Sequence, residues 1–167
     1  MGESNITRAN SVEQYAVIEA LARRIVPDFY APYFERETAE YLVESGHTAM
    51  ALETLAGKGY RHYLIESEAA AVGYFSLLED GAVMLLSHFY LLEEYRGRGL
   101  GQAAMDFIHR EAETAGVQKI ELFVLRRNKG AVGLYQKNGY IFAAEVMTRL
   151  GNGAMLKDYL MRKLIDN

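Results

Sequence analysis

The six residues Arg96-Gly97-Arg98-Gly99-Leu100-Gly101 combine alternating glycines with two arginines. The segment before them, 84–92, is bulky and apolar and predicts a buried strand. After them, apolar residues recur at helical spacing and predict a helix over about 99–115. A glycine-rich turn between a strand and a helix presents backbone amides beside the positive end of the helix dipole. The run is therefore a candidate phosphate-binding loop.

This loop matches neither of two common phosphate motifs. No Lys-Ser/Thr pair follows the last glycine, as a Walker loop requires, and the glycines fall on alternate positions, unlike G-x-G-x-x-G. A tight strand–helix turn whose arginines are merely solvated is the alternative interpretation.

A second segment, Asn128 to Tyr140, follows another apolar run at 119–125. Ala131 and Tyr135 fit one face of a short helix, and Gly139 fits the position just past a helix end. Asn128 at the head of this helix has a side chain suited to capping it.

Taken together, the two segments resemble the GNAT superfamily of acyl-CoA-dependent N-acyltransferases. The first matches the family's R-x-x-G-x-G loop, and the second matches its N-x-x-A-x-x-x-Y-x-x-x-G-[FY] block. The matching residues are Arg96, Gly99 and Gly101, then Asn128, Ala131, Tyr135, Gly139 and Tyr140. The resemblance covers roughly 60–164, and the closing part, 151–161, resembles small bacterial acetyltransferases near the spermidine/spermine group.

The resemblance implies that acetyl-CoA is the acyl donor. Backbone amides from Gly97 to Gln102, with Arg96 and Arg98, would hold the pyrophosphate. The strand before the loop would carry a bulge and pair with the pantetheine arm, and the Leu91 amide would face the thioester carbonyl. The expected cofactor-binding residues are Phe89, Tyr90, Leu91, Arg96, Gly97, Arg98, Gly99, Leu100, Gly101, Gln102, Asn128 and Tyr135.

The resemblance also makes Tyr135 the expected general acid, protonating the departing thiolate. The alternative is a tyrosine that packs its ring and hydrogen-bonds the cofactor without transferring a proton.

The general base is left open by the sequence. Family members often carry Glu nine residues before the loop's first Arg, where this chain has Ser87. His88 is adjacent, and an unperturbed imidazole titrates in the useful range. Strand alternation places Ser87 and His88 on opposite faces and Tyr90 on the face of His88. His88 is the candidate base, Tyr90 could act through water, and bulk water could take the proton. A structural or substrate-positioning role for His88 is the alternative.

The N-terminal third offers aromatic and acidic residues for an amine acceptor. Tyr30, Tyr33, Phe34 and Tyr41 could bind an amine by cation–π contact, with acidic side chains nearby. The alternative is a solvated acidic helix over an aromatic core.

Composition sets limits on the function. A chain of 167 residues with half of them hydrophobic predicts a single domain over 1–167. The net charge of -4 argues against nucleic-acid binding, and the absence of Cys excludes disulfides, thiolate metal sites and a cysteine nucleophile. The four His lack paired ligand spacing, so no metal site is expected. Without a membrane-length apolar stretch or a signal-peptide pattern, the expected location is cytoplasmic.

The predicted elements follow one another in the order of the GNAT fold. A short strand is expected at 6–8, then a helix that starts at the capping box 11–14 and stops near Pro27, and then an aromatic loop at 29–34. The other expected helices are 36–45, 47–57, 99–115 and 129–138, and the other expected strands are 61–67, 70–78, 83–92, 118–125, 140–149 and 155–164. The fold class is α/β (α+β), with a mixed, mostly antiparallel sheet flanked by helices.

These patterns favour one function over two others. The first is an N-acetyltransferase that moves an acetyl group from acetyl-CoA to a primary amine of a small molecule, peptide or protein. The second is a catalytically silent CoA-binding sensor or interaction domain. The third, a nucleotide-phosphate module, leaves the Asn128–Tyr140 segment unexplained. A homodimer is possible, since the resembled family often forms one.

Overall fold

The computed structural model describes residues 4–166 in two compact units. One unit runs up to Leu78 and includes His88–Phe107, and the other comprises Glu79–Ser87 and the chain from Ile108 onward. The elements are β1 (Ser4–Ala9), α1 (Val12–Tyr30), α2 (Arg36–Gly46), α3 (Ala49–Gly57), β2 (Arg61–Ser67), β3 (Ala70–Asp80), β4 (Val83–Leu91), the 3-10 turn η1 (Glu93–Tyr95), α4 (Leu100–Ala115), β5 (Lys119–Leu125), α5 (Lys129–Lys137), β6 (Ile141–Arg149) and β7 (Met155–Leu164).

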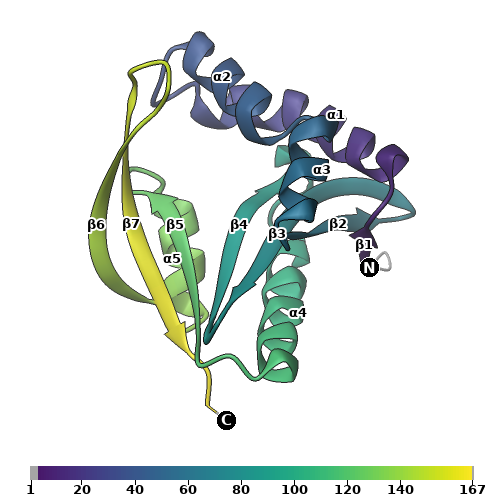
Figure 1. The fold of residues 1–167 in the computed structure, drawn as a ribbon, viewed down its shortest axis with the longest axis vertical. Helices are drawn as coiled ribbons and strands as arrows, with labels where there is room; N and C mark the ends of the chain where they lie inside the picture. The colour runs from purple at the N-terminus through teal and green to yellow at the C-terminus, as the bar shows by residue number, and fades with distance from the viewer. Residues whose placement is uncertain (1–3, 167) are drawn as a thin grey trace. The chain divides into compact units, whose positions relative to one another are not determined.

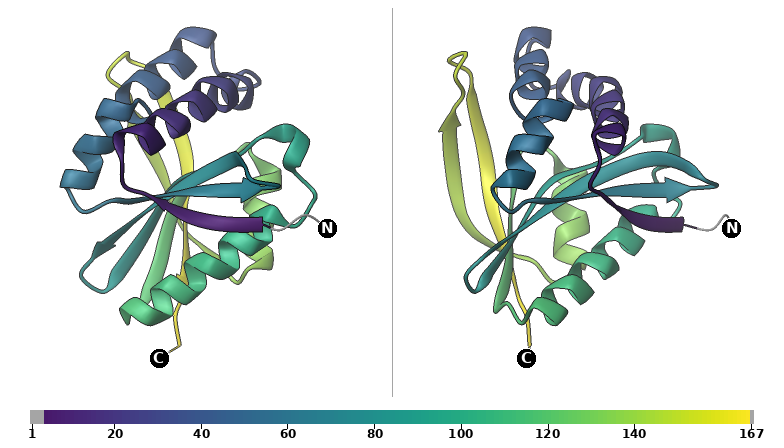
Figure 2. Two further views of the ribbon diagram at one scale, coloured as in Figure 1. Left: turned by 90° about the vertical axis from the view of Figure 1, so that its right-hand side faces the viewer. Right: turned by 45° about the vertical axis from the view of Figure 1, so that its right-hand side comes forward.

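In the first unit, β1, β2 and β3 form an antiparallel sheet that the end of β4 extends. Neighbouring β2 residues point to opposite faces. His62 bonds the Leu52 carbonyl of α3 at 2.9 Å, and the Tyr63 ring lies 5.2 Å from Phe107 of α4. Helices α1 to α3 thus cover one face and the start of α4 covers the other (Figure 2).

Helix α1 begins as predicted and ends later than predicted. The Ser11 hydroxyl accepts a hydrogen bond from the Gln14 amide at 3.2 Å, as a capping residue should. The predicted stop near Pro27 is wrong, because the helix continues to Tyr30 with Pro27 inside it. Val26 and Tyr30 are both buried on its inner face, so packing outweighs the hydrogen bond that proline removes. Phe29 and Tyr30 consequently lie in the helix, not in the predicted aromatic loop.

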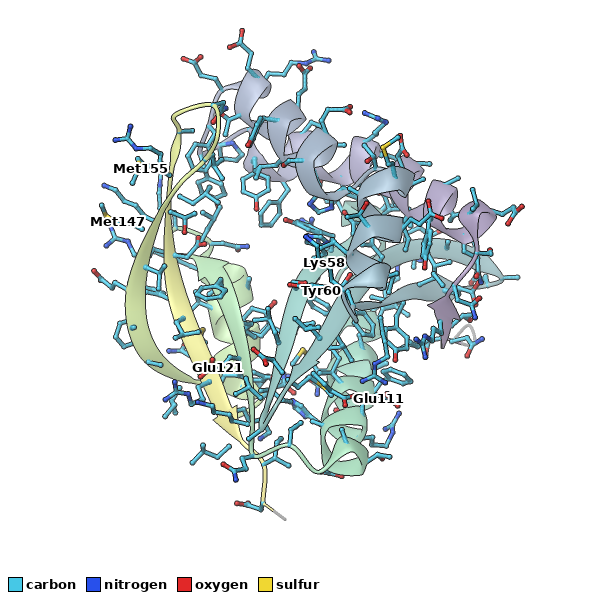
Figure 3. The ribbon with its side chains drawn as sticks, viewed as in Figure 1. Lys58, Tyr60, Glu111, Glu121, Met147 and Met155 are labelled. Atoms are coloured by element: carbon cyan, nitrogen blue, oxygen red, sulfur yellow. The ribbon has the colours of Figure 1, made fainter. Side chains whose placement is uncertain are left out.

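In the second unit, the first half of β4 runs parallel to β5, from Val83 opposite Lys119 to Leu86 opposite Leu122. Strand β7 lies between β5 and the outer strand β6, antiparallel to both (Figure 1). Glu121 of β5 binds Arg162 of β7 at 2.6 Å and is labelled in Figure 3. This ion pair joins two neighbouring strands and holds the pKa of Glu121 below its usual value.

The seven strands have the order β1-β2-β3-β4-β5-β7-β6. The pairings β1–β2, β2–β3, β5–β7 and β6–β7 are antiparallel and β4–β5 is parallel, so the predicted mixed, mostly antiparallel sheet is confirmed. The expected helices and strands after residue 35 all form, with bounds within about two residues of those predicted. None of the helices in residues 4–166 is both long and apolar enough to cross a membrane.

Candidate functional site

The end of β4 carries an irregular backbone at His88. Its φ of 55° lies in the left-handed region, where a residue with a side chain is uncommon. The His47 ring lies 4.2 Å from the His88 ring and 5.6 Å from the Tyr90 ring, measured between centroids. His88 and Tyr90 therefore lie on the same face, as predicted.

The His88 side chain is held in a desolvated environment. Its Nδ1 is buried and has no hydrogen-bond partner within residues 4–166. Burial, and secondarily the nearby His62, lowers the pKa of His88 to about 4. This pKa lies below that of an unperturbed imidazole, because the ring is largely desolvated where it would have to carry charge. At neutral pH His88 is uncharged.

The Leu91 amide points away from β3. The Leu92 N–H donates to the Val72 carbonyl of β3 at 2.8 Å. In an extended strand, successive N–H groups point to alternate edges, so the Leu91 N–H is directed to the opposite edge. A close contact fixes this arrangement, since a Cβ on Gly73 would lie 2.5 Å from the Tyr90 carbonyl oxygen.

The glycine loop has the backbone that its sequence suggests. Gly97 and Gly99 have φ values of 71° and 82°, and nothing lies within 4 Å of the position that a Cβ would take on either. The Gly99 carbonyl accepts the Ala103 N–H, so α4 starts here, and the buried Leu100 anchors its first turn. The first turn of any α-helix directs backbone N–H groups outward from its start, and here that start follows the open positions at Gly97 and Gly99. This is the surface that an anion needs.

The two loop arginines are exposed, and each guanidinium has one contact with a neighbouring residue. Arg96 Nε donates to the Leu91 carbonyl oxygen at 3.3 Å, and the Arg98 guanidinium lies 5.0 Å from the centre of the Tyr95 ring. Arg96 therefore joins the loop to the strand end that carries the Leu91 amide. The Phe89 side chain packs near Phe75, 6.1 Å between centroids, so a role for Phe89 toward a ligand falls to its backbone.

The second unit holds Asn128 and Tyr135 on one helix. Asn128 Oδ1 accepts the Ala131 amide at 3.2 Å, which confirms its predicted capping of α5. Tyr135 is buried, with its ring 5.6 Å from that of Tyr140. Burial raises the pKa of the Tyr135 hydroxyl, so the phenol keeps its proton across the neutral range.

Sequence reasoning missed two residues near His88, namely His47 and Tyr74, whose Nδ1 and hydroxyl are 2.8 Å apart. It named Tyr30 and Tyr90, but not the contact between their hydroxyls, which are 3.1 Å apart. Of the four aromatic residues proposed for an amine, Tyr30 is buried, and Tyr33, Phe34 and Tyr41 are partly exposed. The sequence did contain one clue, since Tyr74 places a hydroxyl within the apolar run 70–78. Its partner His47 is distant in sequence, however, so no local pattern indicates that the two side chains meet.

Comparisons with known proteins place this chain in a family. A family model described as acetyltransferase (GNAT) family matches residues 18–140. The uncharacterized N-acetyltransferase YdgE of Bacillus subtilis is 42% identical over 52 residues, which span 31% of this chain and only 33% of that protein. The uncharacterized protein YdhI of the same organism is 25% identical over 162 residues, covering 87% of this chain and 94% of that protein.

Solved structures share the fold at low sequence identity. One is the PaiA N-acetyltransferase of Thermoplasma acidophilum in complex with coenzyme A (TM-score 0.79, 18% identity, 97% of this chain and 99% of that one). Another is the ribosomal-protein-S18-alanine N-acetyltransferase of Escherichia coli (TM-score 0.74, 16% identity, 99% of this chain and 96% of that one). Because the family model matches most of this chain, the chain belongs to the acetyltransferase (GNAT) family.

Proposed function

We propose that this chain transfers the acetyl group of acetyl-CoA to a primary amine of a small molecule or protein. GNAT acetyltransferases use acetyl-CoA, whose thioester supplies an activated acyl group. The observation that carries the proposal is the loop from Arg96 to Gln102, with its left-handed glycines, open space and helix start. Its alternating glycines and two arginines suit a pyrophosphate.

The Leu91 amide is the proposed donor to the thioester carbonyl. Its N–H is directed away from β3, which leaves it to face a ligand on that edge of β4. Donors placed where negative charge develops are typically worth a factor of about 100–1,000 in rate. Because this donor is a backbone N–H, its position depends on the close approach of β3 to β4 at Gly73.

The proposed acid is Tyr135. Its raised pKa keeps it protonated, so it is a hydrogen-bond donor at every physiological pH. The same shift makes full release of the proton costly, so the proton moves only as negative charge builds on the leaving sulfur.

The proposed proton acceptor is His88. Because burial keeps its imidazole neutral, it can accept a hydrogen bond from an incoming amine. Its pKa of about 4 also means that it cannot hold a proton at neutral pH. His88 would therefore orient the amine and pass the proton on to water, rather than store it.

The low pKa of His88 is also the observation that favours a second function. A CoA-binding domain without catalytic activity would use the same loop and would need no base. The two functions are separated by incubating the chain with acetyl-CoA and a panel of polyamines, amino acids, aminoglycosides and N-terminal peptides, and measuring thiol release. Amine-dependent release supports the enzyme. CoA binding by calorimetry without release from any amine supports the silent domain, and no CoA binding would contradict both.

Gly73→Val is expected to lower kcat at least about tenfold, since it displaces the Leu91 donor. A Cβ at this position meets the Tyr90 carbonyl oxygen at 2.5 Å and the Leu91 Cα at 3.2 Å, so the β4 backbone must move. Gly57→Val is the control, because nothing lies within 4 Å of the corresponding Cβ position on α3. Steady-state thiol release measures both variants. Unchanged kcat in folded Gly73→Val would contradict the role of Leu91.

A further inference from the structure

We propose that His47 is a positioning residue that orients His88 and covers one face of its ring, and that Tyr74 fixes His47 in turn. The role of His88 toward an amine rests on the proposed function, whereas the coupling of the two imidazoles does not. Nothing in the sequence motifs points to His47 or Tyr74, which lie 41 and 14 residues before His88.

His47 is held rigidly by a helix and a strand. It follows the last residue of α2, and its N–H donates to the Val43 carbonyl at 2.8 Å. Its side chain is buried, with Nδ1 2.8 Å from the hydroxyl of Tyr74, a fully buried residue on β3. A single position of the His47 ring is therefore fixed from two sides.

That ring covers one face of His88. The two centroids are 4.2 Å apart, with 32° between the ring planes. The preceding residue, Gly46, is also close, because a Cβ built on it would lie 3.6 Å from His88 Nε2. The end of α2 thus shields one side of His88 from water with an imidazole and a glycine backbone.

Two nearby imidazoles in a desolvated place disfavour charge on each other. Burial first, and His88 second, lower the pKa of His47 well below its usual value. Within residues 4–166, the titratable groups that contact or act on the pair include His62 of β2, Tyr74 of β3 and Tyr90 of β4, and Tyr30 of α1 contacts Tyr90 in turn. The negative end of the α2 dipole favours a charged His88, but desolvation outweighs it.

His62 shows what a purely structural histidine looks like in this chain. Its Nδ1 is 2.6 Å from the Ser76 hydroxyl and its Nε2 is 2.9 Å from the Leu52 carbonyl, so both nitrogens are satisfied. His88 instead keeps a buried Nδ1 with no partner within residues 4–166, on a left-handed backbone. A buried ring nitrogen without a partner, at a strained backbone position, is more typical of a group that contacts a ligand than of one that only packs.

The test is a ¹⁵N NMR titration of the histidine side chains in the free protein. In the wild type, the His88 ring should stay neutral down to about pH 4. His47→Ala exposes the His88 ring to water, so the pKa of His88 should rise by about one unit or more, toward its usual value. His47→Phe restores a ring of similar size over His88 and should keep the pKa low.

Two further variants make the result specific. Tyr74→Phe removes only the hydroxyl that fixes His47 and should shift the ¹⁵N signals of His47 and raise the pKa of His88. Tyr15→Phe removes the hydroxyl of another buried tyrosine, whose ring lies beside His62, and should leave the His47 signals unchanged. If His47→Ala fails to fold, Tyr74→Phe decides. A His88 pKa that stays the same in the folded variants overturns the proposal.

Kinetics complete the test where the chain proves active. His47→Ala should lower kcat about tenfold with little change in KM for acetyl-CoA, and His47→Phe should recover part of that loss. A chain inactive toward every amine would contradict the proposed function, while the NMR result would still decide whether His47 controls His88.

Discussion

Gly99→Asp is expected to weaken coenzyme A binding at least about a hundredfold, equivalent to about 2.7 kcal/mol. Gly99 has a φ of 82°, so a residue with a Cβ is strained there by about 1–2 kcal/mol. The new carboxylate would also enter the space that the loop leaves open and repel a pyrophosphate. Isothermal titration calorimetry with coenzyme A measures the loss.

Gly116→Asp is the matched control. Gly116 has a φ of 68° and the same open space around its Cβ position, but it follows the end of α4 rather than its start. The same strain and charge are introduced away from the loop, so both variants should lose similar thermal stability while only Gly99→Asp loses affinity. Equal affinity in the two variants would contradict the loop's role.

Tyr135→Phe is expected to lower turnover about a hundredfold or more while KM for acetyl-CoA changes little. A positioned proton donor typically contributes a factor of about 100–10,000 to rate, and phenylalanine keeps the ring that packs near Tyr140. Thiol release under saturating acetyl-CoA gives kcat, and its dependence on acetyl-CoA concentration gives KM.

Tyr140→Phe provides the comparison. Tyr140 is a buried tyrosine whose hydroxyl has no hydrogen-bond partner in the part of the chain that the structure describes. Removing an unsatisfied buried hydroxyl should preserve turnover and leave stability unchanged or slightly increased. Full activity in Tyr135→Phe would remove Tyr135 as the acid and leave it a packing residue.

The elements and the loop could be predicted because their signals are local. Alternating glycines next to an apolar run predicted the strand, turn and helix around Gly99, and Asn128 predicted the cap of α5. The end of α1 could not be predicted this way. A proline disfavours a helix locally, and the burial of Val26 and Tyr30 that carries the helix past it depends on residues distant in sequence.

The chemistry of His88 was hidden for a related reason. A side chain's pKa depends on what surrounds it, and here the surroundings come from α2 and β3. The pattern on β4 gave the face of His88 correctly, since that depends on its neighbours at 87 and 90. It could not show that an imidazole from residue 47 would cover that face.

The left-handed backbone at His88 has a consequence for how this chain can evolve. Glycine would adopt a φ of 55° without strain, so evolution toward stability alone would favour losing the imidazole at this position. Retaining histidine there costs on the order of 1–2 kcal/mol of folding free energy in backbone strain. Relatives that have given up a task at this strand end should therefore drift first toward glycine, asparagine or aspartate at position 88, before their fold changes anywhere else.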